Sequence, residues 1–167
     1  MTDLVFVDSN VLIYSRDDDE PAKRVVAHTW LDALWASASG RIGAQVLNET
    51  YWNVTHKFRV PLSSDEARAF VHRFLAWAPV PVDAGLIEAA WRIEGVFQLA
   101  WWDALIVAAA QRADCGFLLS EDLQDGRRFG DALVVDPFRH SPDEVLGGGA
   151  DVVSEPPPRR RRSRRRV

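Results

Sequence analysis

Short apolar runs alternate along the chain with longer segments of helical periodicity. Residues 4–7 form a continuous apolar run, typical of a strand that is buried on both faces of a parallel sheet. Residues 117–119 and 133–135 are similar, while 41–44 and 80–82 are weaker candidates for short strands. Because strands alternate with helices in layered α/β proteins, the pattern predicts a three-layer α/β/α fold with a short, mainly parallel central sheet flanked by helices.

The segments between these runs carry apolar residues at helical spacing. We expect helices over residues 9–14, 21–40, 47–58, from 63 onward, 86–97 and 101–115. Ser63 and Glu66 form an S-x-x-E capping box, which satisfies free backbone N–H groups at a helix start. Residues 104–110 are apolar nearly all round, which predicts that the last of these helices is central.

The apolar pattern ends near residue 140, and proline, glycine and charged residues dominate beyond it. We therefore expect one globular domain over residues 1–140 and a disordered tail over 141–167. Seven of the last nine residues are arginine: Arg159, Arg160, Arg161, Arg162, Arg164, Arg165 and Arg166. Without them, 13 basic side chains remain against 24 acidic ones. This acidic body differs from domains that bind nucleic acid over a broad basic face.

The arginine-rich tail is a candidate for non-specific contact with RNA phosphates, with a solvated appendage or a contact with the acidic body as alternatives. No stretch approaches the roughly 20 apolar residues of a membrane span. No signal peptide is recognisable, so we expect a cytoplasmic protein without membrane contact. The single cysteine, Cys115, excludes an intrachain disulfide and a thiolate metal cluster, and the four histidines lack zinc-ligand spacing.

Acidic residues follow two of the predicted buried strands. Asp8 follows residues 4–7, and Glu121 and Asp122 lie just beyond 117–119, so both sites are expected at the ligand-binding edge of the sheet. Asp103, in the first turn of the central helix, adds a third carboxylate position. Unpaired carboxylates a few ångström apart repel by about 4 kcal/mol per pair at an effective dielectric near 20, and a divalent cation removes this penalty. Mg²⁺ or Mn²⁺ suits such oxygen ligands, and the chemistry indicated is phosphodiester hydrolysis.

Each carboxylate also has an ordinary structural interpretation. Asp8 can serve only as a helix cap, and Asp103 complements the dipole of its helix. Glu49 lies about 200° around its helix from Leu47, opposite the apolar stripe, where a solvated glutamate is expected.

Four fragments in a fixed order carry a family resemblance: residues 5–14 (VFVDSNVLIY), 48–49 (NE), 102–106 (WDALI) and 118–123 (LLSEDL). Together they resemble the motifs of PIN domains, in particular VapC-type toxins, over residues 4 to about 138. The resemblance implies the three-layer fold predicted above, acidic residues that bind Mg²⁺ or Mn²⁺, and endonucleolytic cleavage of RNA. It also implies inhibition by a cognate antitoxin protein and a homodimeric state.

Carried over onto this chain, the resemblance makes Asp8, Glu49, Asp103 and Asp122 an acidic quartet. Asp8, Asp103 and Asp122 would hold the metal, and Glu49 would bind or orient the attacking water.

Polar neighbours complete the predicted site. Asn10 and Ser120 are expected to orient the carboxylates, with a helix cap and a turn residue as equally plausible roles. Glu121 and Asp125 are alternatives to Asp122, because only one of residues 121 and 122 faces the crevice if strand alternation continues.

The function expected from the sequence is a Mg²⁺- or Mn²⁺-dependent endoribonuclease that acts as the toxin of a type II toxin–antitoxin pair. The alternatives are a housekeeping PIN nuclease in RNA processing and a non-catalytic PIN-fold binding module. A phospho-acceptor signalling domain also places an aspartate after a central strand, but here a paired acidic residue beside Asp8 is missing. Most of the seven tryptophans are expected in the core, although Trp101 and Trp102 adjoin Asp103 and are candidates for a cleft wall.

Overall fold

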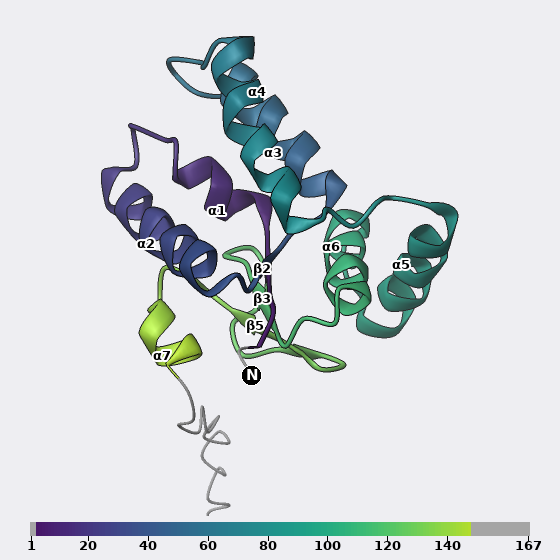
Figure 1. The fold of residues 1–167 in the computed structure, drawn as a ribbon. Coiled ribbons are helices and arrows are strands. Elements are labelled where there is room, and N and C mark those ends of the chain that lie inside the picture. Colours follow the sequence, from purple (N-terminus) through teal and green to yellow (C-terminus); the bar gives the residue numbers. More distant parts are fainter. Residues whose placement is uncertain (1–2, 148–167) are drawn as a thin grey trace, which may run out of the picture.

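The computed structural model describes residues 3–147, which are arranged around a five-stranded sheet (Figure 1). The strands are β1 (Val5–Val7), β2 (Gly40–Arg41), β3 (Phe117–Leu119), β4 (Arg128–Phe129) and β5 (Ala132–Val135). Their order is β2-β1-β3-β5-β4, and only the β4–β5 pair is antiparallel. The predicted mainly parallel α/β fold is therefore confirmed.

The helices follow the predicted order along the chain. They are α1 (Ser9–Tyr14), α2 (Pro21–Ser37), α3 (Ala44–His56), α4 (Ser64–His72), the 3₁₀ helix η1 (Arg73–Trp77), α5 (Ala84–Phe97), α6 (Trp101–Arg112) and α7 (Pro142–Leu146). In Figure 1, α1 and α2 lie on one side of the sheet and α5 and α6 on the other, while α3 and α4 project beyond one end of the strands. The expected capping box between Ser63 and Glu66 is present at the start of α4.

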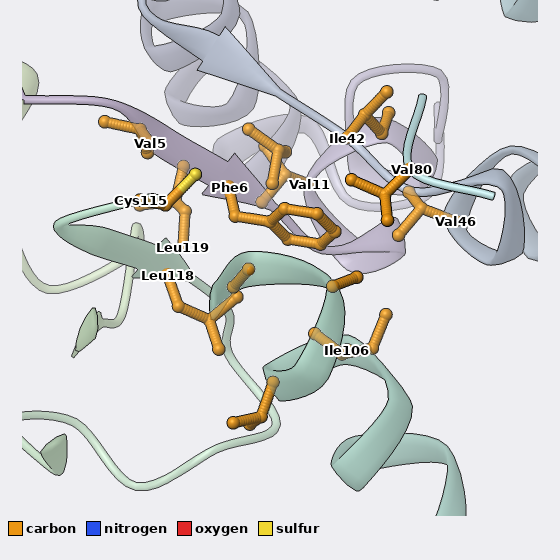
Figure 2. Close-up of a cluster of buried hydrophobic side chains, with 14 of the residues drawn as sticks. Val5, Phe6, Val11, Ile42, Val46, Val80, Ile106, Cys115, Leu118 and Leu119 are labelled. Atoms are coloured by element: carbon orange, nitrogen blue, oxygen red, sulfur yellow. The ribbon is translucent and has the colours of Figure 1, made fainter. Parts of the chain in front are cut away.

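The centre of the core lies between β1, β3 and α6. The side chains of β1 are fully buried, and so is every residue from 104 to 110 of α6 within a few per cent. Figure 2 shows the Phe6 ring close to Val46, Val80 and Ile106, which come from three other segments of the chain. This confirms the prediction that α6 is a central helix, because its small alanines allow close approach to the sheet.

The parallel pairing of β1 with β3 aligns the carboxyl ends of the two strands. Val5 pairs with Phe117 and Val7 with Leu119, so the residues that follow the two strands lie side by side. The backbone N–H of Asp8 continues the ladder by donating to the Leu119 carbonyl at 3.0 Å. The sheet thus brings residues 8 and 120 together, although they are far apart in sequence.

Within residues 3–147, no single helix is long and apolar enough to cross a bilayer. Helices α5 and α6 reach the required length and mean hydropathy only when taken together, and the two are bent by 115° at the break between them.

Three local predictions differ from the structure. No strand was expected between residues 119 and 133, but this segment contains β4, which forms a hairpin with β5 through Gly130 and Asp131. Gly130 has a φ of 61°, and a Gly-Asp pair between two short strands is a known hairpin signal. Val80 forms only an isolated parallel bridge with Gly43 instead of a strand.

The boundary of the predicted disordered tail also needs correction. The tail was expected from residue 141, but residues 142–146 form α7, which contacts α2. Ser141 and Glu144 form a second capping box and Pro142 occupies the first turn, where its missing N–H costs nothing. The rest of the predicted tail, including Arg159 to Arg166, lies outside the described residues.

Candidate active site

The candidate site lies at the ends of β1 and β3, where the sheet meets α1, α3 and α6. Asp8 is the N-cap of α1, and its Oδ1 accepts a hydrogen bond from the Ser9 backbone N–H at 2.7 Å. Its Oδ2 accepts from the Ser120 hydroxyl at 2.7 Å and from the Asn10 amide at 3.2 Å. Asp8 is therefore both a helix cap and the acceptor for polar groups from two strand ends.

Asp8 is only 6% exposed, so its ionised carboxylate is largely shielded from water, which is energetically unfavourable. Burial raises the pKa of Asp8 from 3.8 to about 6, against the lowering effect of the hydrogen bonds from Ser120 and Ser9. The negative charges of Glu49 and Asp122 raise the pKa further. The site thus holds a carboxylate close to other carboxylates, and no neighbouring cation is among the causes of this shift.

Asn10 and Ser120 connect Asp8 to the segment that follows β3. The Asn10 amide also lies 3.3 Å from Asp122 Oδ2, and its Oδ1 accepts from the Glu121 backbone N–H at 3.4 Å. The Ser120 hydroxyl, which donates to Asp8, accepts from the Asp122 backbone N–H at 3.2 Å. Both side chains are buried. Their contacts agree with an orienting position, and Asn10 is not the helix cap because Asp8 fills that place.

Glu49 reaches the same site from α3. Its Oε2 accepts from the Ser9 hydroxyl at 2.9 Å, and its Oε1 accepts from the Gln45 amide at 2.8 Å. The helical wheel placed Glu49 correctly opposite Leu47, but the inference that this face is solvated was wrong. The face is partly covered because α3 packs against α1, which carries Ser9.

Asp103 lies in the first turn of α6 and is half-buried. Burial raises its pKa, and the negative charges of Asp122 and Glu49 raise it further. Asp103 and Asp8 are therefore both affected by the same two neighbouring carboxylates. The four acidic residues expected from the sequence share one electrostatic environment at one end of the sheet.

The candidate site suits a divalent cation by chemistry, but its side chains do not form a closed cage. Its donors are carboxylate oxygens, which Mg²⁺ and Mn²⁺ prefer, and their mutual repulsion is the penalty that such a cation removes. Within residues 3–147, however, no group of three or more acidic, histidine or cysteine side chains lies close enough together to hold a metal ion. The site therefore offers the type of ligand atom that such an ion prefers, but the carboxylates do not lie in positions to coordinate one ion together.

The two alternative acidic residues point to other partners. Glu121 forms an ion pair with Lys23, whose ammonium lies 4.3 Å from the centre of the Tyr14 ring. Burial alone would lower the pKa of Lys23, but its hydrogen bonds to Glu121 and Tyr14 raise it. Asp125 accepts from the His140 ring and from the Asp136 backbone N–H, both at 2.9 Å. Of the three candidates, Asp122 is the one whose side chain contacts Asn10.

Two residues of the site were missed by the sequence analysis. Ser9 and Gln45 both donate to Glu49, and the Gln45 amide also contacts the Trp102 backbone carbonyl at 3.3 Å. Gln45 precedes Glu49 by four positions, which places the two on one helix face. That spacing was a usable signal, whereas the contact of Ser9 with α3 depends on tertiary packing.

Comparison with known proteins identifies the fold and the family. The PIN domain family model matches residues 5–128. The structure of FitAB bound to an IR36 DNA fragment is similar, with a TM-score of 0.60 and 20% identity, and covers 81% of this chain and 96% of that chain. The structure of VapBC2 from Rickettsia felis bound to a promoter DNA fragment is also similar, with a TM-score of 0.53 and 13% identity. The match covers 78% of this chain and 96% of that chain. No curated protein matches the sequence. Since the family model spans most of the chain, this protein belongs to the PIN domain family.

Proposed function

We propose that this protein is a Mg²⁺- or Mn²⁺-dependent endoribonuclease and the toxin of a type II toxin–antitoxin pair. The observation that carries the proposal is the buried Asp8, which is held by Ser120 and Asn10 and is affected by the negative charges of Glu49 and Asp122. Capping α1 does not require a buried charge, because a neutral asparagine caps a helix as well and the burial of Asp8 destabilises its ionised form. Membership of the PIN family supports the nuclease assignment.

Asp8, Asp103 and Asp122 are the residues that would hold the metal. When bound, a divalent cation supplies Lewis-acid stabilisation of phosphate charge and favours ionisation of water. Ser120 and Asn10 fix the oxygens of Asp8, and Asn10 aligns Asp122 with them. Such supporting contacts orient the carboxylates before the substrate arrives.

Glu49 is the residue that would bind or orient the attacking water. Both of its oxygens accept hydrogen bonds from neutral donors, the Ser9 hydroxyl and the Gln45 amide, so the carboxylate is held in one orientation. Attack of water on phosphorus, with departure of the 3′ oxygen, leaves a 5′-phosphate and a 3′-hydroxyl end.

RNA as the substrate follows from the PIN-family resemblance. An antitoxin partner is supported by the similar structures, since FitAB and VapBC2 are two-component complexes on DNA. We propose that this chain corresponds to the nuclease component of such a pair and forms a homodimer.

Cleavage assays with purified protein test the proposal. Structured and unstructured RNA are incubated with Mg²⁺, Mn²⁺ or EDTA, and the wild type is compared with Asp8→Asn and Asp103→Asn. Asp65→Asn is the matched control, because Asp65 is exposed in the first turn of α4. We expect cleavage to need metal and to be lost in the first two variants only. Cleavage that persists in EDTA and in both site variants would contradict the proposed mechanism.

One observation favours a second candidate, a non-catalytic binding module on the PIN scaffold. Among residues 3–147 the carboxylates do not form a ready metal cage. Metal titration separates the two functions. A wild type that binds Mn²⁺ while Asp8→Asn does not supports the nuclease, whereas RNA binding without metal binding or cleavage supports the module.

A further inference from the structure

Two exposed tryptophans lie next to the candidate site. Trp52 is 53% exposed and comes one helical turn after Glu49 on α3, while Trp102 is 63% exposed and immediately precedes Asp103 on α6. Exposure of a tryptophan side chain to water is unfavourable, because most of its surface area is apolar. A single exposed apolar side chain needs no explanation, but two beside the same carboxylates do.

The α3 row consists of Gln45, Glu49, Trp52 and His56. At 100° per residue these four positions fall within about 60° of one another on the helix surface. Contacts within the row agree with this placement, because Gln45 donates to Glu49 and the rings of Trp52 and His56 stack at 3.7 Å with an interplanar angle of 16°. The acidic site and the aromatic pair therefore share one face of α3.

Trp102 is fixed to the opposite end of the α3 row. The Gln45 amide that donates to Glu49 also contacts the Trp102 backbone carbonyl at 3.3 Å. The neighbouring Trp101 is different, since it is partly buried and its ring lies 6.4 Å from that of Trp91 on α5. The structure thus separates the two predicted cleft-wall tryptophans: Trp101 packs against the core and Trp102 remains exposed beside the row.

Glu49 lies between the two aromatic ends. From Gln45, beside Trp102, to Trp52 is about 10 Å along the axis of α3, or about three base steps at a rise of about 3.4 Å. Trp102 stacks on no other aromatic ring among the described residues, and the one aromatic ring stacked on Trp52 is that of His56. Both tryptophans therefore retain exposed ring surface.

We propose that Trp52 and Trp102 are base-stacking platforms that hold unpaired nucleobases of the RNA on either side of the phosphate that is cut. This inference rests on the proposed function and adds the form of the substrate, a single-stranded segment. Stacking suits this chain because acidic side chains outnumber basic ones over the domain, so phosphate contacts contribute little there. Stacking needs no positive charge and tolerates any base. His56 supports the Trp52 ring from one side and keeps its plane fixed.

Binding of a fluorescein-labelled unstructured RNA oligonucleotide to the full chain in EDTA tests the platforms without cleavage. The variants are Trp52→Leu and Trp102→Leu, with Trp52→Phe and Trp102→Phe as conservative replacements that keep a stacking ring. Trp91→Leu is the matched control, since Trp91 is 59% exposed but lies on α5 against Trp101. Circular dichroism melts confirm that each variant is folded.

We expect each Leu variant to bind about 5- to 150-fold more weakly, as for the loss of one base stack, with partial recovery in the Phe variants and no loss in Trp91→Leu. In a series of RNAs that each lack one base at a different position, the affinity of the wild type should fall at one position for each platform. With that RNA, replacing the matching tryptophan by leucine should cause little further loss of affinity. Affinities of both Leu variants equal to that of the wild type would overturn the inference.

The remaining outcomes separate this inference from its premises. A wild type that cleaves RNA while both Leu variants keep wild-type affinity overturns the platforms and leaves the nuclease intact. A wild type that binds no RNA in EDTA overturns the platforms, and one that also cleaves no RNA with Mg²⁺ or Mn²⁺ overturns the nuclease as well. The competing explanation is that the two tryptophans form a contact between copies of the chain, and light scattering tests it by measuring the oligomeric state. If the Leu variants change oligomeric state while the removal of a base weakens their RNA binding as much as that of the wild type, the platforms are overturned in favour of that contact.

Discussion

Replacement of Asp8 by asparagine should stabilise the protein at neutral pH while removing its activity. In the folded protein the pKa of Asp8 is raised from 3.8 to about 6 by burial and by nearby negative charges. Between these two values the unfolded chain has lost the proton that the folded chain still holds. The stability contributed by the folded-state proton is therefore fully present below about pH 4 and is lost as the pH rises to about 6.

The size of the effect follows from the pKa difference. One pKa unit corresponds to 1.36 kcal/mol, so the ionised Asp8 lowers the free energy of unfolding by about 3 kcal/mol at neutral pH. Asparagine has nearly the same shape and does not ionise, so this loss disappears in the variant. It has a single acceptor oxygen for the Ser9, Ser120 and Asn10 donors, and each weakened hydrogen bond costs about 1 kcal/mol at every pH. The absolute gain is therefore smaller, at about 1–2 kcal/mol.

Urea denaturation from about pH 4 to about pH 7.5, in EDTA, measures the effect. The informative quantity is the difference in unfolding free energy between Asp8→Asn and the wild type at each pH, because titrating groups that do not interact with Asp8 cancel in it, whereas the repulsion from Glu49 and Asp122 is part of the effect. We expect this difference to rise by up to about 3 kcal/mol in favour of the variant and to level off above about pH 6 to 7. Asp65→Asn, at an exposed position, should give a difference that stays within about 0.5 kcal/mol.

A difference that does not change with pH would refute the reasoning, because the burial of Asp8 would then impose no penalty on its charge. A difference of opposite sign would show that Asp8 is stabilised as an anion by a positive neighbour. Either result would also remove the main support for a carboxylate kept in place for chemistry.

Three further predictions concern Asp8, Ser120 and two glycines. Ser120→Ala should destabilise the protein by about 1–3 kcal/mol at neutral pH and by less near pH 4, because the lost hydroxyl supports ionised Asp8; urea titrations at both pH values test this. Mg²⁺ at 100 times its Kd should add about 2.7 kcal/mol to the wild type in thermal melts and little to Asp8→Asn. Gly40→Ala should cost about 1–3 kcal/mol, because its Cβ would lie 2.5 Å from the buried Trp77 ring, whereas Gly95→Ala, in open space on α5, should stabilise by about 0.5–1 kcal/mol.

The sequence predicted the fold well because the strongest signals are local. The apolar runs at β1 and β3 and the all-round apolar α6 specify buried elements whatever surrounds them, and the structure buries them as expected. The elements that were missed, β4 and α7, contain only two and five residues. Such segments are too short for periodicity, although Gly130-Asp131 and Ser141-Pro142 carried turn and cap signals.

The candidate site was predictable only in part, for a different reason. Asp8 and Asp122 follow paired strands, so sheet topology alone brings their backbones together. Glu49 depends on how α3 lies against α1, and a helical wheel shows which residues share a face but not what covers that face. The contact of Ser9 with Glu49 has the same origin because it joins α1 to α3, whereas the contact of Gln45 with Glu49 lies within α3 and only its contact with the Trp102 carbonyl joins two helices.

Burial is the main cause of the raised pKa of Asp8, and the negative charges of Glu49 and Asp122 raise it further. Carboxylates fixed on separate elements repel one another, and Ser9, Ser120 and Asn10 satisfy Asp8 with neutral donors that leave its charge uncompensated. A core under selection for stability alone would replace Asp8 with a neutral residue of the same shape. Retention of the charge therefore argues for a ligand that compensates it. An ion of charge +2 is the simplest such ligand, because several carboxylates contribute to the repulsion at once.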